Sequence, residues 1–527
     1  MAPRVAVIGG GLAGITAAIA LAEAGAQVTL LEARPRLGGA TCSFSRDGLT
    51  VDTGQHVFLG CCTEYRGLLG KLGMTAHAPV QDRFDVTVLA PGLRSGRLRR
   101  TALPGPLHML PALGRYPFLS WAERAAVARP ALAMRFLNPA EPRVDEQRFG
   151  DWLAARGQSD RARRALWDLF TVSALNIAGD DASLSLAAIV VKTGLLGKNN
   201  AADIGVPARP LGELHGDAGA ALLTKLGAQI HLGAKVAAID IDPAAAAVPA
   251  ASGSPADRSG FRVRLARIAD PTAPGSGVGA TEIAADAVVL AVPHETAARL
   301  IPSGALPDTA VAGWAGLGAS PIVNVHVIYD RPVTDLPFAA AIDSPVQWVF
   351  DRTRISGLAQ TDPRAQYLAI SLSAADQYVD VPAATLREQF VPALADLFPA
   401  AREAQVTEFF VTRERRATFR QAPGTARLRP QAATQLPGLV LAGAWTDTGW
   451  PDTMEGAVRS GLSAATELRR TLSSVLSAPA LPGSALPGPA LSGPALSASG
   501  LPGTGYSESG LSGFEGNASS ATIGVRQ

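Results

Sequence analysis

The chain has 527 residues, of which 47% are hydrophobic and 17% charged, and its formal net charge is +2. This length exceeds one ordinary hydrophobic core, so two domains are expected. The small net charge excludes the basic footprint of nucleic-acid-binding proteins, and we expect no nucleic-acid partner. The sequence contains no run of about 18 apolar residues that would predict a membrane span.

An apolar strand at residues 4–8 leads into a glycine-rich turn and then an Ala-rich helix. This order, with G-x-G-x-x-G spacing, predicts a dinucleotide-binding βαβ unit and leaves no signal peptide at this end. Gly9 permits the tight turn, Gly11 lets the backbone approach a pyrophosphate, and Gly14 lets the helix pack on the strand. The predicted cofactor contacts of the turn are Gly9, Gly11, Leu12, Ala13 and Gly14.

The second strand, residues 28–31, ends at Glu32. A carboxylate at this position can accept a hydrogen bond from a ribose 2′-hydroxyl and would repel a 2′-phosphate. The sequence therefore predicts FAD or NAD as the cofactor and excludes NADP.

The segment after Glu32 reads Ala-Arg-Pro-Arg-Leu-Gly-Gly, and near the other end a strand at 439–442 ends at Gly443 before a helix. Both segments resemble the flavin amine oxidase and phytoene desaturase superfamily, whose members carry E-A-R-x-R-x-G-G. The resemblance implies FAD, a Rossmann-type, GR2-like α/β domain, and a helix N-terminus facing the flavin. The FAD contacts that it adds to Glu32 are Ala33, Arg36, Gly38, Gly39, Val236, Gly443, Asp452, Thr453, Met454 and Glu455.

The superfamily pattern divides the chain into three parts. Residues 1–84, 205–300 and 415–470 are predicted to form the FAD-binding domain, with a long loop at 243–260. Residues 85–204 and 301–414 are predicted to form a discontinuous α+β substrate domain. Residues 471–527 consist largely of Ala, Leu, Pro, Gly and Ser, which predicts a disordered tail.

Between Thr101 and Ala140 the only acidic residue is Glu123, whereas four arginines stand among apolar helices. One interpretation is a face that contacts a membrane surface. The other is a pair of core helices whose arginines extend to water. Both interpretations are open, and the residues concerned are Met109, Arg115, Phe118, Trp121, Arg124, Arg129, Met134 and Arg135, with Arg94, Arg97, Arg99 and Arg100 upstream.

Several segments resemble the hydroxysqualene dehydroxylase family: Asp-Thr-Gly-Gln-His at 52–56, Ser-Ala-Leu-Asn at 173–176, and Gly443 to Gly461. The similarity covers about residues 4–470 and implies reduction of a C30 allylic alcohol to squalene, alongside other squalene-pathway or hopanoid-pathway enzymes. The chain has Ala444 where these relatives have Asp, so a carboxylate for the flavin's ribityl chain is missing. Two alternatives follow: Asp447 or Asp452 supplies the missing carboxylate, or FAD binds more weakly.

Departure of hydroxide from an allylic carbon requires a proton donor in a dry pocket, and the reduced flavin supplies the hydride. His56 is the predicted proton donor and Gln55 is predicted to orient the hydroxyl, whereas Asp52 is expected to fix their loop. His294 and His326 are expected to be structural. A carotenoid-type desaturase or isomerase, and a flavoprotein that only binds lipid, are the competing hypotheses.

The sequence contains three cysteines and no motif that identifies an electron donor. Cys42, Cys61 and Cys62 form no C-x-x-C pair and predict free thiols and no metal site. The sequence has no second nucleotide-binding fingerprint, so it names no electron donor. We expect a cytoplasmic enzyme, with contact to the inner face of the membrane as an open alternative.

Overall fold

A computed structural model describes residues 2–92, 94–241, 260–266 and 282–472, which belong to one compact unit. The predicted loop at 243–260 lies outside the described residues except for Gly260, and the predicted tail lies outside them beyond Leu472. Because this part of the chain is one unit, the boundaries proposed between a FAD-binding and a substrate domain stay a prediction.

A five-stranded sheet in which all neighbouring strands are parallel forms the first layer, in the order β19-β13-β1-β2-β9. Its inner strands are buried on both faces, as their apolar runs predict. The α/β architecture is therefore confirmed. The strands are β1 (Arg4–Ile8), β2 (Gln27–Glu32), β9 (Gln229–Leu232), β13 (Ala287–Leu290) and β19 (Leu439–Leu441).

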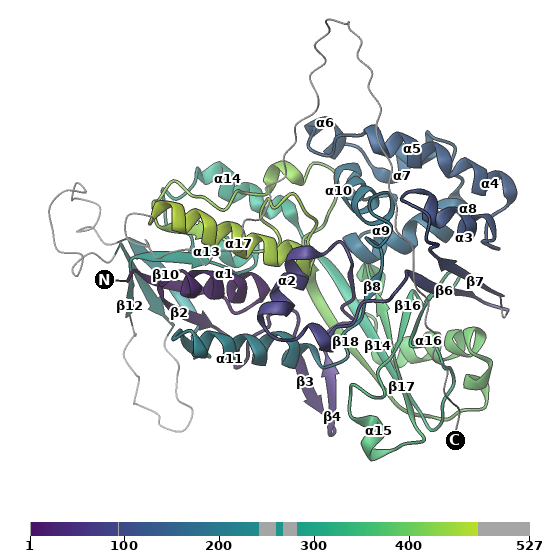
Figure 1. The fold of residues 1–527 in the computed structure, drawn as a ribbon. Helices are drawn as coiled ribbons and strands as arrows, with labels where there is room; N and C mark the ends of the chain where they lie inside the picture. The colour runs from purple at the N-terminus through teal and green to yellow at the C-terminus, as the bar shows by residue number, and fades with distance from the viewer. Residues whose placement is uncertain (1, 93, 242–259, 267–281, 473–527) are drawn as a thin grey trace, which may run out of the picture. The chain divides into compact units, whose positions relative to one another are not determined.

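Three helices cover one face of this sheet: α1 (Leu12–Glu23), α11 (Ala218–Lys225) and α17 (Met454–Thr471). In Figure 1, α1 near the N-terminus and α17 at the C-terminal end of the described chain lie side by side. A Cβ on Gly461 would lie only 2.4 Å from the Ala13 carbonyl oxygen, so the glycine permits this close crossing. The antiparallel strands β10 (Val236–Ile241), β11 (Phe261–Leu265) and β12 (Glu282–Ala285) form a small sheet whose apolar residues join the core on the opposite face.

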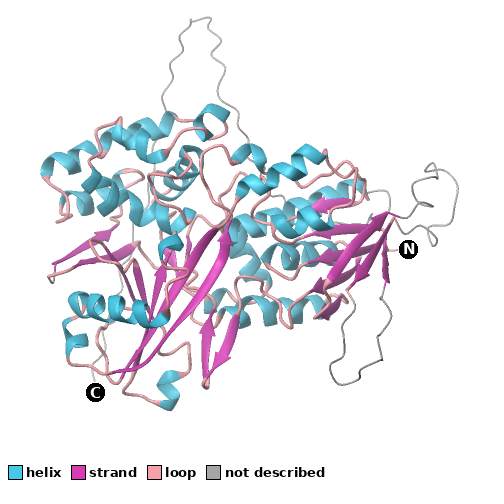
Figure 2. Cartoon of the chain, turned by 180° about the vertical axis from the view of Figure 1, so that it is seen from behind, coloured by secondary structure: helices cyan, strands magenta, loops and turns pink. Residues whose placement is uncertain are grey.

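A second sheet has seven strands in the order β18-β14-β17-β16-β15-β6-β7, and only the pair β15–β6 is parallel. Figure 2 shows its long strands in magenta. Helix α16 (Ala383–Leu397) covers one face, where its leucines and Phe390 pack on the valines of β14. The strands are β6 (Asp85–Ala90), β7 (Arg94–Arg99), β14 (Ser320–Tyr329), β15 (Phe338–Ala341), β16 (Trp348–Asp351), β17 (Gln366–Leu372) and β18 (Val406–Thr418).

A layer of short helices separates β7 from β8 (Ile204–Gly205). Phe118 and Met134 belong to its core, whereas the Trp121 side chain is 76% exposed. No described helix is long and apolar enough to cross a membrane. The elements of this layer are η2 (Leu107–Met109), α3 (Leu110–Gly114), α4 (Trp121–Ala126), α5 (Ala128–Phe136), α6 (Pro142–Asp145), α7 (Phe149–Ala154), α8 (Asp160–Ala162), η3 (Arg163–Trp167), α9 (Asp168–Leu175), α10 (Leu184–Val190) and η4 (Val191–Leu195).

Shorter elements connect these layers. The hairpin β3–β4 reaches the seven-stranded sheet, β5 pairs with β8, and α2 packs on α17. Their bounds are β3 (Ser43–Arg46), β4 (Leu49–Asp52), β5 (Phe58–Leu59), α2 (Thr63–Lys71), η1 (Thr75–His77), η5 (Gly212–Asp217), α13 (His294–Leu300), α14 (Asp308–Gly313), η7 (Trp314–Leu317), α15 (Leu358–Thr361), η8 (Ala375–Gln377), η9 (Pro399–Arg402) and η10 (Ala426–Leu428).

Candidate functional site

The three glycines of the first turn have different surroundings. Gly9 has a φ of +108°, and a Cβ on Gly14 would lie 1.8 Å from the Gly9 carbonyl oxygen. A Cβ on Gly11 would meet only Gly39 Cα, at 3.8 Å. The protein therefore needs Gly9 and Gly14 for its own packing, whereas the space above Gly11 is open to a ligand at the N-terminus of α1.

Glu32 is buried at the end of β2, as predicted. Its Oε2 accepts a hydrogen bond from Gly10 N–H and its Oε1 accepts one from Arg34 N–H, both at 2.7 Å. A carboxylate has further lone pairs, so it can also accept a ribose hydroxyl. Val236 begins β10 close by, since Ala234 N–H donates to the Glu32 carbonyl oxygen.

The next segment folds back onto the glycine turn. Gly38 N–H donates to the Gly10 carbonyl oxygen at 2.8 Å, and Gly11 and Gly38 form a parallel bridge. Ala33 and Arg36 are exposed at this end of the sheet. The two glycine segments therefore form one continuous backbone surface.

A polar pocket collects most of the remaining predicted residues. Leu12 of α1, Gly38, and Thr453 and Met454 at the start of α17 line it, so residues about 440 positions apart share one wall. Gln55 and His56 line the same pocket, together with Thr41, Thr53, Asn176, Ser371, Ala444 and Asp452.

Three buried polar atoms around this pocket have no hydrogen-bond partner among the described residues: Gln55 Oε1, His56 Nδ1 and Asn324 Oδ1. Buried polar atoms are normally paired, so these three are available to hydrogen-bond a bound group. Together with the open space above Gly11 and the N-terminus of α17, they fit a flavin dinucleotide. The sequence did not single out Asn324 as a site residue. Its place in the strand β14 indicates only that its side chain is buried.

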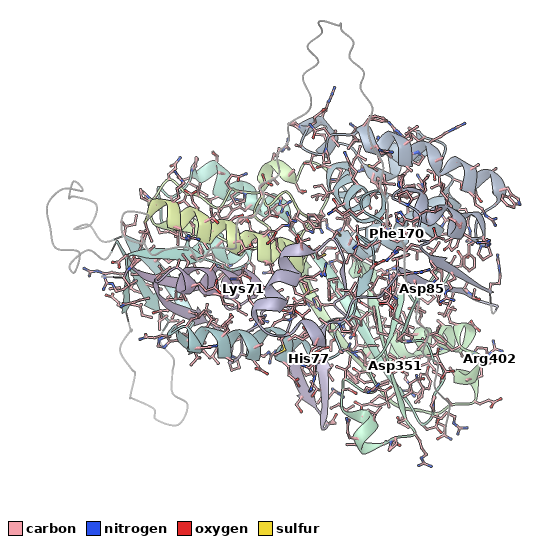
Figure 3. All side chains as sticks on the ribbon, in the orientation of Figure 1. Lys71, His77, Asp85, Phe170, Asp351 and Arg402 are labelled. Atoms are coloured by element: carbon pink, nitrogen blue, oxygen red, sulfur yellow. The ribbon has the colours of Figure 1, made fainter. Side chains whose placement is uncertain are left out.

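The loop that carries Gln55 and His56 is fixed by a buried ion pair. Arg352, which follows Asp351 at the end of β16 (labelled in Figure 3), donates to Asp52, and Ser43 Oγ and Leu211 N–H donate to the same carboxylate. This arrangement agrees with the expected structural role of Asp52. Burial lowers the pKa of His56, so its imidazole is neutral at pH 7.

An apolar pocket adjoins the polar one and shares Val57, Ser173, Ala174, Thr453 and Met454 with it. Trp348 Nε1–H donates to Ser173 Oγ at 2.7 Å and holds this part of the wall. The rest of the wall is almost entirely apolar; it includes Phe58, Leu59, Phe84, Leu169, Phe170 (labelled in Figure 3), Val190, Leu195, Ile204 and Trp450. Cys61 and Cys62 also face this pocket, whereas Cys42 is buried elsewhere.

The loop after β19 lacks the carboxylate at residue 444 but brings another one to the pocket. Asp452 lines the pocket, accepts a hydrogen bond from Phe419 N–H at 2.9 Å, and has a pKa raised to about 6 by burial. Asp447 is exposed and bonds Gln431, so it is not placed to compensate.

The same loop is held by Arg429, which the sequence did not single out. Its guanidinium is buried and donates to the carbonyl oxygens of Ala444, Trp445, Thr446 and Trp450. Burial lowers its pKa. A lone Arg in a loop carries no sequence signal for such a role.

Glu455, which was predicted as a cofactor contact, lines the apolar pocket, and its carboxylate is engaged within the protein. It accepts hydrogen bonds from Glu64 N–H and Tyr65 N–H and pairs with Arg459 at 2.8 Å. Its side chain therefore anchors the N-terminus of α2 to α17.

His215 and His326 are buried near these pockets without facing them. Tyr65 and Tyr367 bond the two imidazoles, and burial lowers the pKa of His215 to about 4 and that of His326 to about 3. His326 is therefore a neutral core residue.

The chain matches the model of a family described as flavin containing amine oxidoreductase over residues 12–469. It is 30% identical over 481 residues to hydroxysqualene dehydroxylase of Rhodopseudomonas palustris, covering 88% of this chain and 98% of that relative. It is 26% identical over 485 residues to 15-cis-phytoene desaturase of an Oncidium hybrid cultivar, covering 87% of this chain and 76% of that relative.

Solved structures agree at the level of fold. Cyclohexylamine oxidase from Brevibacterium oxydans IH-35A superposes with a TM-score of 0.62 at 19% identity, covering 90% of this chain and 100% of that chain. The family match and the relative at 30% identity confirm the predicted flavin-dependent oxidoreductase. The chain belongs to the flavin containing amine oxidoreductase family.

Proposed function

We propose that this protein reductively dehydroxylates hydroxysqualene to squalene with FAD as its cofactor. The observation that carries the proposal is the apolar pocket, which shares five lining residues with the polar pocket that Gln55 and His56 line. A polyisoprenoid buries its chain in such a pocket at about 0.8 kcal/mol per methylene-sized group. The R. palustris relative bears this activity in its name, and the chain covers almost all of its length.

The reaction is balanced as alcohol plus reduced FAD giving alkene hydrocarbon, water and oxidised FAD. When bound, the reduced flavin supplies the hydride. In the proposal Gln55 orients the substrate hydroxyl. His56 donates the proton with which this hydroxyl leaves as water. The apolar wall excludes bulk water until the hydride has been delivered.

We propose the domain boundaries, location and partners of the protein on the same basis. Residues 85–204 and 301–414 would contribute the substrate domain, and residues 1–84, 205–300 and 415–470 the FAD-binding domain. The cytoplasmic face of a membrane is the proposed location, because a C30 hydrocarbon partitions into lipid. Other enzymes of squalene or hopanoid synthesis would be partners there, and the electron donor is external.

The direction of hydride flow tests the proposal. Photoreduced enzyme mixed anaerobically with hydroxysqualene should regain the oxidised flavin spectrum at the rate at which squalene forms. In D2O the product should carry one deuterium on the former carbinol carbon, because the flavin N5–H exchanges with solvent.

Phytoene with the oxidised enzyme is the matched control. If phytoene reduces the flavin and hydroxysqualene leaves reduced flavin unchanged, the protein is a desaturase and the proposal is wrong. If neither substrate changes the flavin while both bind, it is a lipid-binding flavoprotein.

A further inference from the structure

Exposed large apolar side chains gather in one stretch of the described chain. Six of them lie between residues 103 and 136, and the other two are at the far end of the parallel-sheet region, Leu232 and Ile241. Trp121 and Phe136 are 76% and 82% exposed, which is unusual for such large apolar groups. The six are Leu103, Leu107, Leu110, Trp121, Leu132 and Phe136.

Helices α4 and α5 present part of this set as one stripe. Val127 between them keeps α-helical backbone angles, so residues 121–136 form an almost unbroken helix. Pro130 removes one backbone N–H, and Gln158 Nε2–H donates to the Ala126 carbonyl oxygen that this leaves free. On such a helix Trp121, Leu132 and Phe136 lie on one face at spacings of 11 and 4 residues. We call this face the α4–α5 stripe.

The charge around the stripe is positive. Arg129 and Arg135 are exposed on α5, Arg115 is exposed after α3, and none of the three has an ion-pair partner among the described residues. Glu123 is occupied by hydrogen bonds from Ser120 and Ser159.

Three of the four upstream arginines form ion pairs. Arg97 and Arg99 pair with Asp85, and Arg100 pairs with Asp203. Asp85 neutralises only one of its two arginines, and Arg94 is exposed without an ion-pair partner among the described residues, so positive charge extends from the stripe to β7.

The stripe adjoins the wall of the apolar pocket. Helix α5 packs against η4, whose Thr193, Gly194 and Leu195 line that pocket. Lys192 Nζ–H donates to the Leu137 carbonyl oxygen at 2.6 Å and ties η4 to the end of α5. Helix α5 and η4 therefore lie between a surface that contacts the stripe and the pocket.

We propose that the α4–α5 stripe with Leu103, Leu107 and Leu110 seats the protein on an anionic lipid bilayer. Apolar Trp, Leu and Phe side chains enter the headgroup boundary, and Arg115, Arg129 and Arg135 contact the phosphates. If the proposed function holds, the substrate enters the pocket from the bilayer past η4. Binding of the protein to lipid does not rest on the proposed function.

Sedimentation with vesicles tests this without turnover. The FAD-loaded full chain should bind phosphatidylglycerol vesicles at least about tenfold more tightly than phosphatidylcholine vesicles. Exchanging the stripe by Trp121→Ser, Leu132→Ser and Phe136→Ser should weaken binding to both by more than about tenfold. Arg129→Gln with Arg135→Gln should remove only the preference for phosphatidylglycerol.

Leu232→Ser with Ile241→Ser is the matched control and should bind vesicles like the original chain. Flavin absorbance and melting temperature report whether each variant is folded. The proposal is overturned if the folded serine variant binds vesicles unchanged, or if the original chain stays in the supernatant. It is also overturned if ultracentrifugation without lipid reveals a dimer that the serine variant abolishes, because a second copy would then cover the stripe.

Discussion

At the scale of single residues, Gly11 and Gly14 separate cofactor binding from folding. Gly11→Ala places a methyl group in open space above the turn, so the fold should survive and FAD affinity should fall by more than about tenfold, or 1.4 kcal/mol. Gly14→Ala forces a Cβ into the Gly9 carbonyl oxygen and should lower the melting temperature of the apoprotein. Equilibrium dialysis and thermal melting measure the two effects. Unchanged FAD affinity in Gly11→Ala would show that the pyrophosphate binds away from Gly11.

His56 should impose a pH dependence on the chemical step. Its pKa is lowered by burial, so the imidazolium that donates the proton becomes populated only as the pH falls below the usual histidine range. Single-turnover squalene formation should therefore rise as the pH is lowered. His56→Ala should slow it about a hundredfold and remove this rise while FAD stays bound. An identical pH profile in the variant would assign the proton to another group.

Asp452 should make FAD binding sensitive to pH. Its carboxyl has a pKa of about 6, and the charged form is the better acceptor for a ribityl hydroxyl. FAD affinity should therefore decrease as the pH falls through about 6. Asp452→Asn should bind FAD about tenfold more weakly at pH 8, without this pH dependence. Adding Ala444→Asp to the Asp452→Asn variant should restore FAD affinity. If Asp452→Asn binds FAD unchanged and Ala444→Asp has no effect, Asp452 has a structural role only.

At the scale of elements, the start of α17 depends on Glu455. Glu455→Ala leaves the N–H groups of Glu64 and Tyr65 unpaired in the interior, which should destabilise the protein by about 1–3 kcal/mol. Glu467→Ala in the same helix removes only the surface pair with Arg470 and should cost less than about 1 kcal/mol. Melting temperatures compare the two, and equal shifts would contradict the anchoring role.

At the scale of the whole molecule, the Asp52–Arg352 pair joins the loop that carries Gln55 and His56 to the seven-stranded sheet. Arg352→Met leaves a buried carboxylate without its cation and should cost about 3–5 kcal/mol. Adding Asp52→Asn should recover part of this loss. Arg354→Met, on an exposed side chain nearby, is the control and should change little. Additive melting-temperature shifts in the double variant would mean that the two residues act independently.

The sequence by itself determined the α/β class, the glycine turn and the presence of a helix after Gly443, because each depends on local patterns: apolar runs, G-x-G-x-x-G spacing and the motif of the C-terminal segment. It also indicated the family, since both cofactor segments carry their own motif. Only the tertiary structure decided which side chains face the site. Glu455 turns to α2, Asn324 joins Gln55 and His56, and Arg429 holds the loop after β19. These roles depend on contacts between segments 271 to 391 residues apart or on loop geometry, neither of which leaves a local pattern in the chain.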